Sequence, residues 1–171
     1  MKLACKILVV IALLLAVFLA AARMGDGPIA IVAGGPLTSG ELLPSSGVDF
    51  SFAENMDTIE IQLLEPPRSR TTWVVFDEGY LYVPAGFMTL PIWKQWPREA
   101  VQDGRAIVRI DGIRYPFLLE RVKDRKTWQK VGLLSTKKYM PGEPESSMEL
   151  GPERWDEFWI FRLSPRPLTR L

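Results

Sequence analysis

The chain has 171 residues, and its 21 Lys and Arg against 20 Asp and Glu give a formal net charge of +1. This balance predicts no strong attraction to nucleic acids or other acidic polymers. The chain contains no His and one Cys, which excludes His-dependent catalytic triads, zinc sites built from Cys and His, dithiol redox motifs and internal disulfides. We therefore expect no metal site.

Residues 1–24 are typical of one transmembrane helix. Lys2 and Lys6 precede an unbroken apolar run over residues 7–22, which with its flanks is just long enough to cross a bilayer core of about 30 Å. The positive residues favour a cytoplasmic N-terminus, and so an inner-membrane protein with its domain on the periplasmic, extracytoplasmic side. A signal peptide cleaved after Ala22, which would release a secreted domain, is the alternative. The length of the run favours the retained anchor.

Residues 25–48 are rich in Gly, Pro and Ser, with breakers at Gly34-Gly35-Pro36 and at residues 44–47. This composition predicts a linker or an extended lead-in rather than a packed element. Gly34-Gly35 is no phosphate-binding loop, because the Lys-Ser/Thr ending and the following helix of such a loop are missing. The folded domain is therefore expected over residues 49–171.

Six segments of this domain have alternating or β-branched and aromatic patterns that predict strands. Asp77-Glu78-Gly79 and Asp111-Gly112 supply the turn chemistry of two hairpins. Pro116 lies within one of these segments and predicts an edge strand or a bulge. The six segments are 58–64, 72–76, 80–84, 106–110, 113–122 and 159–163.

Two segments have helical patterns. Residues 93–103 carry spaced apolar side chains and end before Gly104, and residues 125–138 follow Asp124, a favourable helix cap. Six antiparallel strands with two short covering helices predict a mostly β (α+β) domain. We expect a small barrel, because closure removes the exposed strand edges that hairpins otherwise leave.

A series of short motifs follows in a recognisable order along residues 49–122, with a weaker echo at 159–163. The motifs are DFSF at 49–52, TIEIQL at 58–63, an Arg-rich turn before TTWV at 71–74, LYVP at 81–84, KQWP at 94–97, and VQD at 101–103 leading into RAIVRI at 105–110. In this order they resemble the pyridoxamine-phosphate-oxidase-like split β-barrel superfamily, which includes the flavin- and deazaflavin-dependent nitroreductase-like branch. The resemblance implies a split barrel, FMN or a deazaflavin as cofactor, and a homodimer.

The resemblance also implies which residues would hold the cofactor. In the family, basic and hydroxyl side chains of the second strand, and residues after the third strand, hold the flavin phosphate. A tryptophan at 73, 93 or 96 would stack on the isoalloxazine ring. The matching positions are Arg68, Arg70, Thr71 and Thr72 in the first group, Pro84, Ala85, Lys94 and Arg98 in the second, and Trp73, Trp93 or Trp96 for the ring.

The same residues have purely structural interpretations. Arg68 and Arg70 flank a predicted turn and would be solvated there, Lys94 and Arg98 would form an exposed helix face, and Trp93 and Trp96 would fill the core. Residues 84–87 read Pro-Ala-Gly-Phe, where oxidases of the superfamily carry further phosphate-binding residues.

Two functions therefore stay open, and no catalytic residue or substrate is identified. The first is a membrane-anchored flavin- or deazaflavin-binding oxidoreductase, whose chemistry comes from the cofactor and needs no His. The second is a cofactor-free envelope module that binds a small ligand, a lipid or a protein. A hydrolase is disfavoured, because the carboxylates of Asp77, Glu78 and Asp103 lie in predicted turns.

Overall fold

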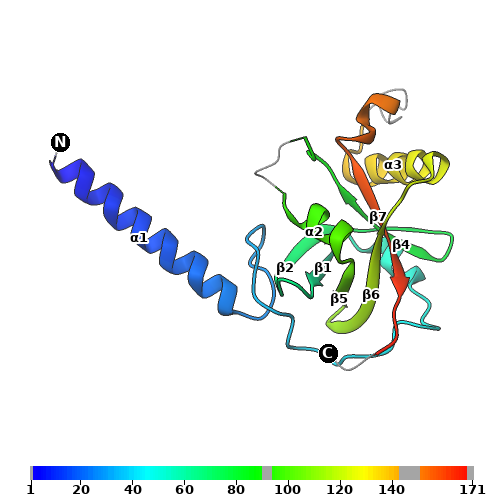
Figure 1. The fold of residues 1–171 in the computed structure, drawn as a ribbon, viewed down its shortest axis with the longest axis horizontal. Helices are drawn as coiled ribbons and strands as arrows, with labels where there is room; N and C mark the ends of the chain where they lie inside the picture. The colour runs from blue at the N-terminus through cyan, green and yellow to red at the C-terminus, as the bar shows by residue number, and fades with distance from the viewer. Residues whose placement is uncertain (1, 90–93, 143–150, 169–171) are drawn as a thin grey trace.

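The computed structural model describes residues 2–89, 94–142 and 151–168, so Trp93 lies outside the described residues. One long N-terminal helix is followed by a β domain with short helices between its strands (Figure 1). In chain order the elements are α1 (Lys2–Met24), η1 (Ser51–Asn55), β1 (Thr58–Leu63), β2 (Ser69–Trp73), β3 (Val75–Asp77), β4 (Tyr80–Ala85), α2 (Trp96–Gln102), β5 (Arg105–Ile110), β6 (Ile113–Arg121), α3 (Arg125–Tyr139), η2 (Pro152–Trp155) and β7 (Trp159–Pro165).

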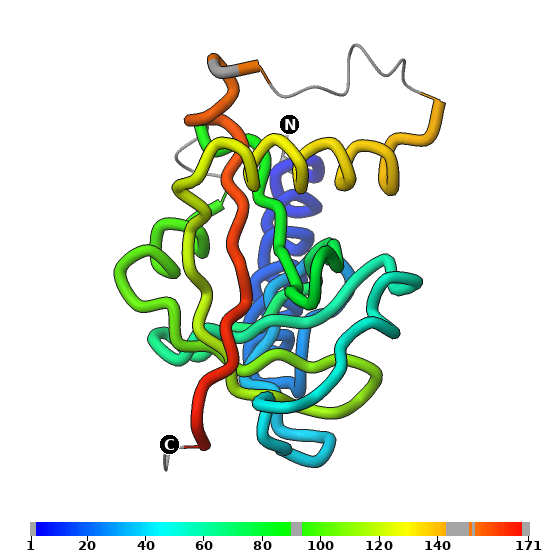
Figure 2. The backbone as a smooth tube through the Cα atoms, turned by 90° about the vertical axis from the view of Figure 1, so that its right-hand side faces the viewer, coloured from blue at the N-terminus to red at the C-terminus, as the bar shows by residue number. Residues whose placement is uncertain are grey.

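The seven strands form one antiparallel sheet in the order β2-β1-β5-β6-β7-β4-β3. β2 and β3 are the two edges of this order, yet only Val74 separates them in the chain. The sheet therefore has to curl until its edges approach each other, and Figure 2 shows the strands wrapping around a common interior. The predicted mostly β (α+β) fold is confirmed, but the single strand expected at 72–76 is divided between the two edges.

Strand alternation places the core inside the curled sheet. Ile59, Ile61 and Leu63 of β1 are buried, as their period-two spacing predicts, and they join Phe117 and Phe161 in one interior cluster. The turn after β5 also forms as predicted, because Asp111 and Gly112 both have the positive φ that a tight two-residue hairpin requires.

The prediction that Pro116 marks an edge or a bulge is wrong for its strand as a whole, because β6 lies between β5 and β7. The ladder to β7 begins only at Phe117, which faces Pro165. Beyond that point the carbonyl of Pro116 accepts hydrogen bonds from Ser45 Oγ at 2.6 Å and from the Arg166 N–H at 3.2 Å. A proline is tolerated in this central strand because one side of it lies past the end of the β7 ladder.

α3 is capped as predicted, with Asp124 accepting the N–H of Thr127 at 2.8 Å. It covers the outer face of the sheet (Figure 2), where Trp128 and Val131 pack with Tyr82 and Ile160. α2 begins at Trp96, three residues later than predicted, and Pro97 lies in its first turn, where a missing N–H is harmless.

α1 extends away from the barrel (Figure 1), and almost all its described side chains are exposed. Leu3–Met24 is long and apolar enough to cross a membrane, by the same criteria that an N-terminal signal sequence satisfies.

Residues 25–48, which we call the strap, contain no helix or regular strand but pack on the barrel. Leu37 and Ser45 are buried, and isolated bridges join Gly34 to Ser69 and Leu42 to Arg114. Asp26 forms an ion pair with Arg109 at 2.9 Å. The prediction that residues 25–48 are not a packed element is wrong, because the strap contacts residues far along the chain.

Candidate functional site

A cavity of about 480 Å³ lies where β2 and the end of β4 approach each other. Its volume is within the range of roughly 300–1,000 Å³ that small-molecule sites occupy. Its walls come from five parts of the chain. These are β2 (Thr71, Thr72, Trp73), the end of β4 and the loop after it (Pro84, Gly86, Phe87, Thr89), the start of α2 and the segment just before it (Trp96, Lys94), the residue after α3 (Met140), and η2 with the turn after it (Arg154, Glu157, Phe158).

Six of the residues that the resemblance implies for a cofactor lie around this one cavity. They come from three separate stretches of chain, so the curling of the sheet brings them together. Ala85 follows Pro84, but its own side chain is buried in the barrel core. The six are Thr71, Thr72, Trp73, Pro84, Lys94 and Trp96.

Arg70 lies behind the cavity wall. The structure places it within β2 rather than beside a turn, so the solvated interpretation of this residue is wrong. Its guanidinium carbon is 5.9 Å from the centre of the Trp96 ring, and its buried Nε has no hydrogen-bond partner. Burial lowers the pKa of Arg70 to about 10, although Glu99 opposes the shift. A buried cation with an unsatisfied donor beside a cavity is a candidate anion-binding group.

The other two arginines that the resemblance implies for the cofactor, Arg68 and Arg98, do not line the cavity. Arg98 donates to the carbonyls of Met88 and Lys94 at 2.6 and 3.1 Å, so its guanidinium is engaged with main-chain groups rather than forming an exposed helix face. Arg68 is exposed, and its backbone N–H donates to Pro66. The cationic groups at the cavity are therefore Lys94, whose pKa is lowered by burial, and Arg154, with Arg70 behind the wall.

The aromatic side chains at the cavity differ in their surroundings. The exposed ring of Trp73 stacks on Tyr139, with ring centres 4.4 Å apart and an interplanar angle of 6°. Trp96 is buried against Phe161, so it is a core residue as well as part of the wall. Phe87 is exposed and has φ 61°, which places a large apolar side chain beside the opening on a strained turn.

The sequence did not identify the wall formed by Arg154, Glu157 and Phe158. Arg154 Nε lies 3.6 Å from Glu157 Oε2, and the ring of Phe158 packs over Gly86. These residues follow a polar, irregular part of the sequence that shows no helical or strand period. Their place at the cavity depends on how β7 pairs with β4, which no local pattern indicates.

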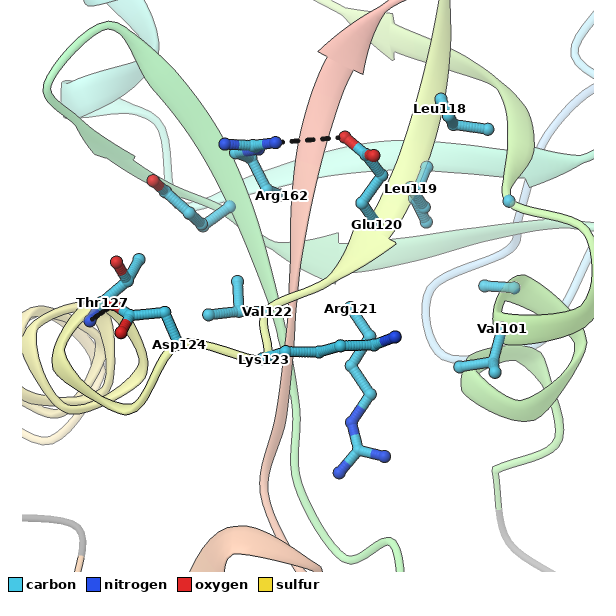
Figure 3. Close-up of a pocket in the computed structure, with 13 residues that line it drawn as sticks. Val101, Leu118, Leu119, Glu120, Arg121, Val122, Lys123, Asp124, Thr127 and Arg162 are labelled. Atoms are coloured by element: carbon cyan, nitrogen blue, oxygen red, sulfur yellow. Dashed lines mark hydrogen bonds and ion pairs between the residues drawn. The ribbon is translucent and has the colours of Figure 1, made fainter.

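A second cavity of about 580 Å³ lies between the end of β6, α2 and the start of α3 (Figure 3). None of the predicted cofactor positions lines it. Glu120 accepts hydrogen bonds from Ser164 and, at 3.3 Å, from Arg162, and these bonds lower the pKa of Glu120. The guanidinium of Arg121 lies 3.9 Å from the centre of the Trp159 ring. The charged groups of this cavity are thus largely engaged with protein groups.

Within the described ranges, no group of three or more His, Cys, Asp or Glu side chains could hold a metal ion. The lining of the first cavity offers hydroxyl, ammonium, guanidinium, carboxylate and aromatic groups instead. This combination suits an anionic, aromatic organic ligand rather than a metal centre.

No protein-family model matches the sequence, and no curated protein gives a significant match. Solved structures do match. A conserved hypothetical protein from Mycobacterium tuberculosis superposes with a TM-score of 0.52 at 13% identity, over 68% of this chain and 77% of that chain. A candidate pyridoxamine 5′-phosphate oxidase from Listeria innocua has a TM-score of 0.44 at 15% identity, over 68% and 90% of the two chains. An F420 reductase superposes with a TM-score of 0.45 at 13% identity, over 70% of this chain and 97% of that chain.

At these identities the likeness establishes the fold alone. Together with the strand order and the closure at Val74, it makes the domain a split barrel. This is the fold of the pyridoxamine-phosphate-oxidase-like superfamily that the sequence resembles, and the fold prediction is confirmed.

Proposed function

We propose that this protein is a membrane-anchored split barrel that binds FMN or a deazaflavin in the cavity between β2, the end of β4 and the start of α2, and acts as an oxidoreductase. One observation carries the proposal: six residues chosen from the sequence alone surround a single cavity of ligand size.

The residues present fit the phosphate end of such a cofactor. Lys94 provides an ammonium group, and Thr71 and Thr72 of β2 provide hydroxyl donors. Arg70 contributes a positive charge behind them, with a buried Nε that still lacks an acceptor. Cations and hydroxyl groups converging on one site are how proteins bind phosphate, and a low-dielectric wall strengthens each contact.

The aromatic side chains around the cavity fit the ring end of such a cofactor. Trp73, exposed and fixed by its stack on Tyr139, presents a flat face beside the cavity, and Phe87 and Phe158 add apolar surface. These side chains would orient the ring and exclude water from it. The bound cofactor itself would supply the hydride or electron transfer.

The proposed location is the inner membrane, with α1 as the anchor and the barrel on the periplasmic side. Length and apolarity of Leu3–Met24 support the anchor, and Lys2 and Lys6 before it support a cytoplasmic N-terminus. Release as a secreted domain after signal cleavage is the alternative. A homodimer also stays a proposal, and sedimentation of the purified protein would test it.

A cofactor-free binding module is the second candidate. The arrangement of the arginines favours it, because Arg98 is occupied by main-chain carbonyls and Arg68 lies away from the cavity. Trp96 likewise has a sufficient role in the core. A split barrel that had lost part of its phosphate-binding set would have these features.

The test is a titration of the protein, in detergent micelles or nanodiscs, with FMN, FAD and the deazaflavin F420. Binding is measured by equilibrium dialysis and by the quenching of tryptophan fluorescence. We expect Lys94→Met to weaken binding of the favoured cofactor by about 10- to 100-fold, because a charge-assisted hydrogen bond contributes about 1.5–3 kcal/mol. Thr72→Val is expected to weaken binding less.

The matched control is Lys123→Met, which removes the same side chain from the second cavity. Equal affinity of the Lys94 and Lys123 variants would contradict the proposed site. A folded protein that binds none of the three cofactors would contradict the oxidoreductase proposal and leave the binding module.

A further inference from the structure

The strap begins with a tight apolar hairpin directly after α1. Ile29 and Val32 exchange both backbone hydrogen bonds, from the Ile29 N–H to the Val32 carbonyl at 3.1 Å and from the Val32 N–H to the Ile29 carbonyl at 2.9 Å. Ala30 and Ile31 form its tip, and the Ile31 side chain is 97% exposed. Such a two-residue loop holds an isoleucine out into the surroundings with little freedom to turn it inward.

The hairpin lies in an uncharged part of the chain, since no Lys, Arg, Asp or Glu occurs between Asp26 and Glu41. Single exposed apolar side chains are common on proteins and need no explanation. The position of this one is the informative feature. It follows by a few residues the end of a helix that is apolar and exposed along its length, so the two apolar surfaces are neighbours.

The base of the hairpin is fixed to both the barrel and the end of α1. Gly34 donates its N–H to the Ser69 carbonyl at 2.9 Å, and Ser69 Oγ donates to the Gly35 carbonyl at 2.5 Å. A Cβ at Gly34 would lie 1.7 Å from the Gly27 carbonyl oxygen, and one at Gly35 would lie 2.6 Å from that of Arg23. The hairpin therefore has a set place beside the helix end, where Figure 1 shows this segment lying between α1 and the sheet.

We infer that the tip of this hairpin, Ile29 to Ile31, inserts into the interfacial layer of the bilayer that α1 spans. The inference rests on the proposed membrane anchoring. One or two side chains are far too small a surface for a protein partner, since stable interfaces bury about 1,200–2,000 Å². They are enough for a shallow contact with a bilayer to which the chain is already tethered. Because the tip is uncharged, the contact needs no anionic lipid and persists at high salt.

Site-directed fluorescence in the full-length chain tests the insertion. In a Cys5→Ser background, the variants Ile31→Cys, Glu78→Cys and Leu14→Cys each receive one environment-sensitive nitrobenzoxadiazole label, and each protein is reconstituted into phosphatidylcholine vesicles. Lipids with a nitroxide high on the acyl chain quench labels in the membrane, and iodide quenches labels in water. Glu78 is the matched control, since it lies in the turn between β3 and β4 and its side chain is 78% exposed.

We expect the label at position 31 to emit at shorter wavelength than the label at 78, with several-fold stronger lipid quenching and several-fold weaker iodide quenching. Lipid quenching at 14 together with water-like behaviour at 31 would overturn the inference and leave the anchor intact. Absence of lipid quenching at 14 would overturn the anchor and the inference with it. Protection of position 31 from iodide without lipid quenching would indicate a protein contact and also overturn the inference. Because Ile31 makes so little contact with the protein, its replacement is not expected to impair folding.

Discussion

The hydroxyl of Tyr139 lies within hydrogen-bond distance of both backbone groups of Val74: it accepts the Val74 N–H at 2.9 Å and approaches the carbonyl at 2.6 Å. Val74 is the residue at which the chain passes from one edge of the sheet to the other. Lys138 Nζ lies 3.2 Å from the same carbonyl, and the Tyr139 ring stacks on Trp73. The last turn of α3 therefore holds the crossover that closes the barrel.

Tyr139→Phe keeps the ring stack and removes only the hydroxyl. We expect it to lower the free energy of unfolding by about 1–3 kcal/mol, because the Val74 N–H then loses its partner. Chemical denaturation followed by tryptophan fluorescence would measure the change. Tyr80→Phe, at an exposed tyrosine, serves as the control and should have little effect. Equal effects of the two substitutions would show that the crossover does not depend on this hydroxyl.

The alkaline limit of stability should also depend on Tyr139. Burial raises the pKa of Tyr139 to about 12, whereas an unfolded tyrosine has a pKa of about 10. The folded state thus retains its proton to higher pH, so this stabilisation is complete below pH of about 10 and is lost as the pH rises toward 12. The free energy of unfolding of Tyr139→Phe should fall less steeply over that interval. The free energy of unfolding of this variant should still decline somewhat with rising pH, because burial also raises the pKa of Tyr82. An unchanged slope would contradict the assignment.

Asp26 should make the strap sensitive to acid. Burial acts to raise the pKa of Asp26, but hydrogen bonds from Ser39, the Thr38 N–H and Arg109 outweigh it and hold this pKa far below its ordinary value of 3.8. The resulting stabilisation is present above pH of about 4 and is lost as the pH falls. Asp26→Asn should lower the free energy of unfolding at neutral pH by about 1–2 kcal/mol and flatten its decline in acid.

Asp103→Asn is the matched control for this prediction. The Asp103 and Asp26 side chains are 30% and 31% exposed, but their arginine partners differ, with Arg105 52% and Arg109 11% exposed. An exposed pair contributes about 0–1 kcal/mol, so Asp103→Asn should cost less. Denaturation at several pH values compares the two variants, and a larger loss at Asp103 would contradict the structure.

Gly34→Ala should loosen the strap. A Cβ at this position would overlap the main chain of Gly27 and Pro28, which cannot move aside as a flexible side chain can. We expect a loss of at least about 1–3 kcal/mol and faster proteolytic cleavage within residues 25–48. Pro36→Ala, at an exposed position of the same segment, should leave both unchanged. Wild-type protease resistance in Gly34→Ala would mean that the strap is held in another way.

Local chemistry was enough to predict several elements. The alternation of Ile59, Ile61 and Leu63, the turn at Asp111-Gly112 and the cap at Asp124 each depend on a few adjacent residues, and all three form as predicted. Features that depend on distant segments were not predicted. The break at Val74 follows from where β2 and β3 find partners, and Pro116 is tolerated because β7 ends beside it.

The same distinction applies to the candidate site. Thr71, Thr72 and Trp73 could be selected because they lie on one strand in a motif order with a family resemblance. Arg154 and Glu157 could not, because they reach the cavity only through the pairing of β7 with β4. Arg68 and Arg98 had suitable chemistry, but the chain turns one outward and engages the other with carbonyl groups.

The attachment of the strap sets the route by which a pulling force would enter the domain. Tension on α1 would first load the Asp26–Arg109 ion pair and the bridge between Gly34 and Ser69, before any strand of the sheet was drawn out. At its far end, Ser45 lies between the Pro116 carbonyl and the Arg166 N–H, so the strap reaches the segment after β7 as well. A force applied through α1 would therefore be carried by this ion pair and by the backbone bridge of the strap while the barrel stayed closed.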